Sequence, residues 1–186
     1  MAKTVVMVGT LDTKGEEFAY VRALLKKKRV KTIVVDFGVL GEPAFAPDVS
    51  RSTVAAAGGG DLERFRFGEH KAEALQVMAD GLAHVVRQLY DAEKLDGILG
   101  MGGSGGTAIA TQAMRTLPVG VPKLMVSTVG GGDVSAYAGD KDITFMPSIV
   151  DVAGFNRISR AIYTNAAGAI AGMVTLRVTA PEDVGD

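Results

Sequence analysis

The chain of 186 residues contains no cysteine and no tryptophan, and it has only two histidines, His70 and His84. The absence of cysteine excludes disulfides and thiolate metal sites. Both histidines fall on one predicted helix, where we expect surface or packing roles. No Ser-His-Asp, zinc-protease or kinase motif is present. The sequence therefore carries no complete catalytic signature of these classes.

An excess of charge of one sign is also missing, because 20 Lys and Arg balance 21 Asp and Glu. No overall basic field favours nucleic acid as a partner. No run of roughly 18 uncharged apolar residues predicts a membrane span, and the nearest approach, 161–176, predicts a buried Gly/Ala-rich helix. The apolar start, Val5–Val8, is too short for a secretion signal. We expect a cytoplasmic protein that binds neither nucleic acid nor membranes.

Apolar residues and glycine, in contrast, are abundant, at 47% hydrophobic residues and 24 glycines that gather at a few points. Apolar, β-branched segments alternate with segments of helical spacing. We expect strands at 4–8, 32–37, 97–101, 123–129 and 143–150, and helices at 16–28, 69–89, 107–117 and 156–174. A short helix capped by Ser50 or Ser52 should end at Ala57.

This alternation predicts a doubly wound α/β fold, with a mostly parallel sheet of about five strands between two helix layers. Its strand order should be Rossmann-like or flavodoxin-like. We expect one nucleotide-binding domain over residues 1–178 and a tail over 179–186. Ligands of such folds bind at the carboxyl ends of the strands, where the glycine-rich turns of this sequence fall.

The first of these turns, residues 9–15, places polar side chains between a strand and a helix. Thr10, Asp12 or Thr13 should cap this helix, and Glu16 would complete a capping box to Thr13. Lys14 falls in the first turn, where a cation opposes the helix dipole unless a bound phosphate compensates. Local capping and ligand binding stay open for the candidates Gly9, Thr10, Asp12, Thr13 and Lys14.

The second turn contains four glycines within five residues, at 102–106, after an apolar strand. Its backbone N–H groups and the following helix N-terminus suit a phosphate, assisted by hydroxyl groups. The chain lacks a P-loop motif, and its first strand–helix turn lacks the dinucleotide fingerprint, so a standard dinucleotide site is disfavoured. Tight packing of strand on helix is the alternative for the candidates Gly102, Gly103, Ser104, Gly105, Gly106 and Thr107.

The third turn follows the fourth predicted strand, and its consecutive glycines favour close approach of a ligand or of another backbone segment. Its candidates are Ser127, Thr128, Gly130, Gly131 and Gly132. Asp36, at the end of the second strand, is a candidate ribose ligand or a loop cap. Asp140 and Asp151 are candidate Mg²⁺ ligands or turn residues. We expect the three turns to form one phosphate-binding site.

Four segments in this order, 9–15 (GTLDTKG), 97–107, 122–128 (PKLMVST) and 151–159 (DVAGFNRIS), resemble one family. It is the tobamovirus-resistance-protein-like ATP-binding family, whose bacterial members are mostly uncharacterised. The resemblance spans about residues 4–176 and implies ATP bound by the loops after strands one, three and four, in a homodimer or higher homo-oligomer. It also implies a second, C-terminal domain as partner, which a chain ending at Asp186 does not include.

Three functions remain to be distinguished. The favoured one is an ATP-binding domain with a ligand-binding or regulatory role. The second is part of an enzyme of phosphorylated small molecules, completed by the C-terminal domain, with acid–base or metal roles for Asp12, Asp140 or Asp151. The third is an interaction domain that dimerises through its last helix. The residues alone leave open whether the protein is an enzyme.

Overall fold

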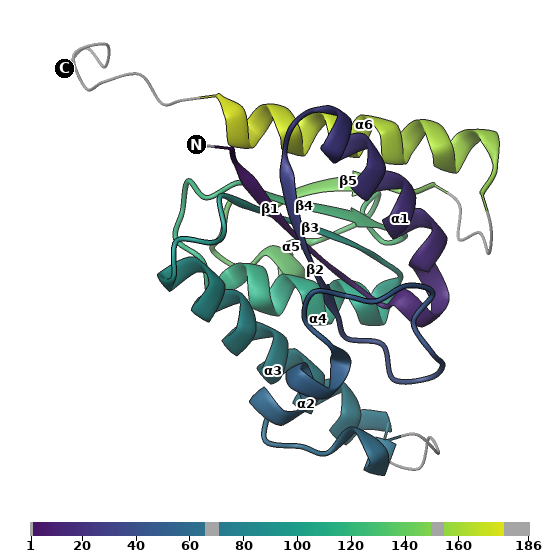
Figure 1. The fold of residues 1–186 in the computed structure, drawn as a ribbon, viewed down its shortest axis with the longest axis vertical. Coiled ribbons are helices and arrows are strands. Elements are labelled where there is room, and N and C mark those ends of the chain that lie inside the picture. Colours follow the sequence, from purple (N-terminus) through teal and green to yellow (C-terminus); the bar gives the residue numbers. More distant parts are fainter. Residues whose placement is uncertain (1, 66–70, 150–154, 177–186) are drawn as a thin grey trace.

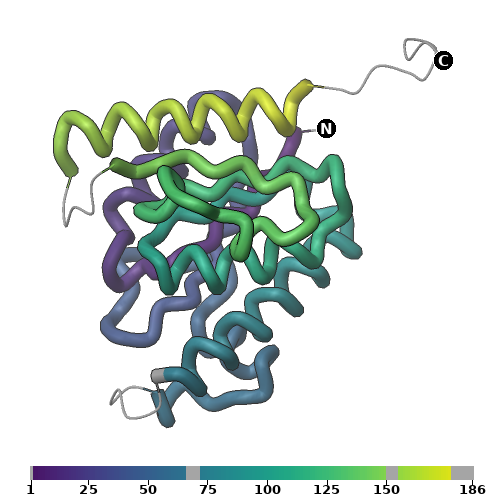
Figure 2. The backbone as a smooth tube through the Cα atoms, turned by 180° about the vertical axis from the view of Figure 1, so that it is seen from behind, coloured from purple at the N-terminus to yellow at the C-terminus, as the bar shows by residue number. Residues whose placement is uncertain are grey.

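The computed structural model describes residues 2–65, 71–149 and 155–176, which form three layers. A five-stranded sheet lies between α1 (Leu11–Lys27) and α6 (Arg157–Thr175) on one face and α2 (Arg51–Ala57), α3 (Lys71–Asp91) and α4 (Ser104–Arg115) on the other (Figure 1). Figure 2 shows the same layers from behind, with α6 at the top of the view and α3 toward the bottom. The predicted three-layer α/β fold is confirmed.

All five strands are parallel, in the order β2-β1-β3-β4-β5. Of the two predicted orders, this is the flavodoxin-like one, whose switch point lies between β1 and β3. Gly9 pairs with Asp36 and Gly102 with Ser127, so neighbouring strands end level with one another. The strand bounds are β1 Thr4–Gly9, β2 Lys31–Asp36, β3 Gly97–Gly102, β4 Lys123–Ser127 and β5 Thr144–Pro147.

Two hydrophobic cores fill the spaces on the two faces of the sheet. Because alternate strand residues point to opposite faces, Val6 and Val8 pack with α2, α3 and α4, while Val5 and Met7 pack with α1 and α6. This double burial explains the continuous apolar strands of the sequence. No helix of the described residues is long and apolar enough to span a membrane.

Two helices begin earlier than predicted. α1 begins at Leu11 and not at Glu16, with a kink at Lys14, and α4 begins at Ser104 and not at Thr107. Gly105 and Gly106 are therefore part of the first helical turn, which the low helix propensity of glycine did not indicate.

The fifth strand is shorter than predicted, because Ile149 has a φ of 63°, outside the extended region. The predicted tail, 179–186, lies outside the described residues.

A close contact between α2 and α3 fixes the position of α3. A Cβ atom on Gly58 would lie 2.0 Å from the carbonyl oxygen of Val77, and one on Gly81 would lie 1.9 Å from that of Val54. Only glycine allows the two backbones to approach this closely. The same helix then presents Ala74, Leu75 and Met78 toward the carboxyl end of the sheet. The remaining helical elements are the short α5 (Ser135–Ala138) and a 3₁₀ turn (Leu62–Phe65).

Candidate functional site

The start of α1 is held by Asp36, which has no exposed surface at the end of β2. Its Oδ1 atom accepts hydrogen bonds from the backbone N–H of Leu11 (3.0 Å) and of Gly38 (2.9 Å), while Oδ2 is buried without a partner. Burial raises the pKa of the Asp36 carboxyl group above its ordinary value, against the two backbone hydrogen bonds that lower it. Of the two roles predicted for Asp36, the structure shows the loop cap.

The predicted capping box at the start of α1 is wrong. The N-cap residue is Thr10, whose side chain makes no capping hydrogen bond and instead pairs with the hydroxyl of Thr13 (2.8 Å). The free N–H of Leu11 is taken by Asp36, which is distant in sequence. A carboxylate from the neighbouring strand replaces the local cap that the sequence pattern favoured.

The carboxylate of Asp12 holds the loop that follows β2. Its Oδ2 atom accepts hydrogen bonds from the backbone N–H of Leu40 (2.9 Å) and of Gly41 (3.1 Å). Gly38 passes so close beneath it that a Cβ there would lie 2.6 Å from Oδ1. The guanidinium of Arg51 donates to the carbonyl oxygen of Gly41 and secures the loop from the other side. The loop is thus fixed with Val39 and Leu40 beside α1.

The first turn of α4 has unused hydrogen-bond donors. The N–H of Thr107 donates to the carbonyl of Gly103 (2.8 Å), and the N-cap Gly103 offers no side chain. The backbone N–H groups of Ser104, Gly105 and Gly106 have no acceptor within the described part of the chain. A Cβ atom on Gly105 or Gly106 would meet nothing within 4 Å. Uncapped N–H groups at a helix start with open space beside it suit an anion.

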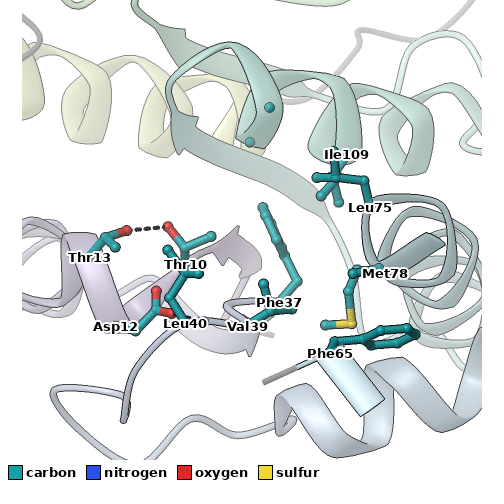
Figure 3. Close-up of a pocket in the computed structure, with 13 residues that line it drawn as sticks. Thr10, Asp12, Thr13, Phe37, Val39, Leu40, Phe65, Leu75, Met78 and Ile109 are labelled. Atoms are coloured by element: carbon teal, nitrogen blue, oxygen red, sulfur yellow. Dashed lines mark hydrogen bonds between the residues drawn. The ribbon is translucent and has the colours of Figure 1, made fainter. Parts of the chain in front are cut away.

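A cavity of about 310 Å³ lies between the starts of α1 and α4, at the switch point of the sheet (Figure 3). Thr10, Asp12 and Thr13 form its polar side, and Gly105 and Gly106 border it from α4. The rest of its wall is apolar, made of Phe37, Val39, Leu40, Phe65, Ala74, Leu75, Met78 and Ile109. An apolar cavity with a few polar groups at one side is the usual form of a small-molecule site.

The apolar wall of the cavity was missed in the sequence, because hydrophobic residues on α3 and after β2 predict core positions as readily as a binding site. The one available signal was the helical face of α3, on which Leu75 stays 40% exposed. An exposed leucine in line with core residues indicates a face that the fold leaves partly uncovered.

The third turn lies beside the second but does not line the cavity. Ser127 is buried and pairs with the hydroxyl of Thr107 (2.6 Å), so both hydroxyls are used within the protein. The N–H of Thr128 donates to the carbonyl of Gly102 (3.3 Å), and Gly130 packs against Pro147 of β5. The structure thus brings the first two turns to the cavity, while Gly131 and Gly132 lie exposed away from it.

The other predicted residues take varied places. Gly9 packs against Phe18, whose ring would lie 2.0 Å from a Cβ there. Lys14 sits at the kink of α1, does not line the cavity and has no ion pair among the residues described. Asp140 is exposed after α5, and Asp151 lies outside the described residues. No group of three His, Asp or Glu in the described ranges could hold a metal, and the Mg²⁺ site stays a prediction.

Fold and cavity define a flavodoxin-like, doubly wound α/β domain with a mainly apolar cavity at its switch point. The chain belongs to the uncharacterised protein family UPF0261, whose N-terminal domain it matches over residues 3–179. This match confirms the resemblance carried by the four sequence segments, as does the similarity to tomato proteins named for resistance to ToMV.

Two relatives and one solved structure are similar to this chain to different degrees. The UPF0261 protein of Clostridium tetani is 45% identical over 186 residues, which are all of this chain and 46% of that protein. The ToMV resistance protein Tm-1(GCR237) of Solanum lycopersicum is 30% identical over 196 residues, covering 96% of this chain and 26% of that protein. The match to the solved structure of Drosophila melanogaster DJ-1beta covers 94% of this chain and 91% of the DJ-1beta chain, with 12% identity and a TM-score of 0.44. The chain spans about half or less of the curated relatives' length.

Proposed function

We propose that this domain binds a nucleotide, ATP, in the cavity between α1 and α4. The observation that carries the proposal is the first turn of α4, where three N–H groups have no acceptor among the described residues and a Cβ on Gly105 or Gly106 would meet nothing within 4 Å. Phosphate oxygens would accept these hydrogen bonds, and the positive end of the α4 dipole would favour their charge.

The apolar wall of the cavity would hold the base. Phe37, Phe65 and Met78 offer the flat and polarisable surfaces on which an aromatic ring packs well. On the polar side, the carboxylate of Asp12 would accept a hydrogen bond from an amino or hydroxyl group of the nucleoside. We retain Lys14 as the cation for the outer phosphates, with Mg²⁺ as a second source of positive charge.

A pair of glycine substitutions tests this placement. Gly105→Ala with Gly106→Ala adds two methyl groups where a Cβ meets nothing, so the helix gains stability, by roughly 1 kcal/mol per site. The same methyl groups would occupy the space of the phosphates, and we expect ATP affinity in calorimetry to fall about tenfold or more.

The matched control is Gly168→Ala with Gly172→Ala on α6. A Cβ at either position also meets nothing within 4 Å, and neither glycine lines the cavity. This variant should gain similar stability and bind ATP as the parent does. Equal ATP affinity in parent and Gly105/Gly106 variant would refute the placement. No binding by the parent at millimolar ATP, with or without Mg²⁺, would refute the function.

A catalytic role within a longer protein is the second candidate, because the curated relatives are about twice as long or more. The carboxylate of Asp12, which lines the cavity, would then act as a general base on a phosphorylated small molecule. Nucleotide or phosphate-ester turnover by the full-length Clostridium tetani relative, lost on replacing the residue aligned with Asp12 by Ala, would support this candidate. Turnover unchanged by that substitution would exclude it.

We further propose a cytoplasmic homo-oligomer that associates through the outer side of α6. On that side Ile158 and Leu176 are 52% and 79% exposed. Exposed large apolar side chains favour association with another surface. Light scattering of the parent and of Ile158→Arg, with and without ATP, tests this association, because a charge at that position should yield monomers.

A further inference from the structure

Arg160 differs from the other arginines that lie over aromatic rings. The guanidinium of Arg22 lies 5.7 Å from the ring of Phe45 and pairs with Asp48 (3.4 Å). Arg87 lies 5.4 Å from the ring of Tyr90 and pairs with Asp91 (2.8 Å). In both cases a carboxylate neutralises the charge that the ring helps to position.

The guanidinium of Arg160 instead lies against two rings and has no carboxylate. It is 5.4 Å from the ring centre of Tyr20 and 5.0 Å from that of Phe155, and these rings meet edge to face at 5.0 Å. In the described part of the chain no Asp or Glu oxygen lies within 4.0 Å of it. The two rings therefore hold the planar guanidinium group of Arg160 in place, and no carboxylate of the described residues compensates its charge.

Arg157 adds a second cation one turn away, and it too has no ion pair among the described residues. Both arginines lie in the first turn of α6, where a cation opposes the helix dipole and where like charges three residues apart repel each other. The first turn contains no acidic residue, and the N-cap Asn156 is neutral. This arrangement costs stability in the free domain, which indicates that its charges serve a binding role.

The two arginines border an open hollow of about 680 Å³ on the α1/α6 side of the sheet. Polar side chains of Tyr20, Asn156, Thr164 and Asn165 also line it. The hydroxyls of Tyr20 and Thr164 bond to each other at 2.8 Å. The lining consists of Tyr20, Phe155, Asn156, Arg157, Arg160, Ala161, Thr164 and Asn165. In Figure 1, α1 and α6 cover the face of the sheet opposite to α3 and α4, and none of these residues lines the cavity at the switch point.

We propose that this hollow is a second binding site, for the phosphate group of a phosphorylated small molecule. A phosphate monoester carries close to two negative charges at neutral pH, which match two guanidinium groups. The planar fork of arginine suits bidentate contact with phosphate oxygens. The side-chain amide of Asn165 would add a neutral hydrogen bond. The site is independent of the nucleotide proposed for the cavity.

Titration of ¹⁵N-labelled domain with inorganic phosphate and then with glycerol 3-phosphate, at constant ionic strength, tests the proposal. We expect saturable shifts of the Asn165 side-chain amide and of the Arg157 and Arg160 Nε–H signals. In Arg157→Gln with Arg160→Gln, the phosphate Kd read from the Asn165 amide should rise about tenfold or more. The thermal midpoint should not fall much, because the substitutions also remove like-charge repulsion at the helix start.

The matched control is Arg22→Gln, which removes an arginine that also lies over a ring but is paired with Asp48. It should leave phosphate binding unchanged. Shifts that do not saturate, or an equal loss in Arg22→Gln, would overturn the proposal, because they indicate general screening of charge. ATP titration of the Arg157/Arg160 variant separates the two sites. Unchanged ATP affinity supports a separate site, whereas lost affinity would make the hollow the nucleotide site and overturn its independence.

Discussion

Asp36, the last residue of β2, accepts a hydrogen bond from the backbone N–H of Leu11, the first residue of α1, at 3.0 Å. The two residues lie 25 positions apart in the sequence. This bond joins the ends of the paired strands β1 and β2, since Gly9 and Asp36 are register partners. The polar side of the cavity therefore depends on a fully buried carboxyl group.

Asp36 should make stability depend on pH in an unusual direction. Burial raises its pKa in the folded state above the ordinary value of an aspartate, so the folded protein retains the proton to higher pH than the unfolded chain. The contribution of Asp36 is complete below pH 3.8 and is lost as pH rises through the folded pKa. Relative to Asp36→Asn, the parent should lose stability toward neutral pH in urea unfolding. A difference that does not change with pH would contradict this assignment.

Asp142 should show the opposite dependence. Partial burial alone would raise its pKa, but hydrogen bonds from Lys123 Nζ (2.7 Å) and from the N–H of Gly120 (2.8 Å) lower it overall. A lowered pKa stabilises the fold above the unfolded value, and this stabilisation is lost as pH falls through the folded pKa. We expect the free energy of unfolding in urea to fall less steeply with decreasing pH in Asp142→Asn than in the parent. The control Asp140→Asn, which changes an exposed neighbour, should keep the pH dependence of the parent.

Asp12→Ala should release the loop that follows β2. The substitution removes the acceptor for the N–H groups of Leu40 and Gly41, and we expect a loss of about 1–3 kcal/mol in the free energy of unfolding. Hydrogen exchange at these two amides should quicken more than elsewhere. Thr13→Ala is the control, because its hydroxyl bonds only to Thr10. Unchanged exchange at Leu40 would show that Asp12 does not hold the loop.

Gly81→Ala should destabilise the domain although alanine favours helices. Its Cβ would lie 1.9 Å from the carbonyl oxygen of Val54, so α2 and α3 must separate. Overpacking of this kind costs about 1–3 kcal/mol, and backbone rather than a side chain must yield here. Thermal unfolding measures the change in stability. The control is Gly168→Ala, where a Cβ meets nothing within 4 Å and the substitution should raise the thermal midpoint. A neutral Gly81→Ala would mean that the helices are not tightly packed.

The sequence predicted the layers of the fold because their signals are local. The β-branched run of β1 and the helical spacing of α3 are repeated patterns within short windows, and burial follows from them. It also placed the first two glycine-rich turns at the carboxyl edge, and the structure finds them at one cavity. The prediction failed at the start of α4, where glycines predict a loop but the helix, whose buried residues begin at Thr107, extends back to Ser104.

The alternation of strands and helices, the parallel sheet and the position of the turns were thus determined by the sequence itself, through periodicity and turn chemistry. Only the tertiary structure decided which groups meet: that Asp36 caps α1, that Ser127 and Thr107 satisfy each other, and that α3 completes an apolar cavity. These contacts join residues far apart in the chain, and their partners depend on strand order and close helix packing. No local pattern encodes such distances, so the site exists only once the chain has folded.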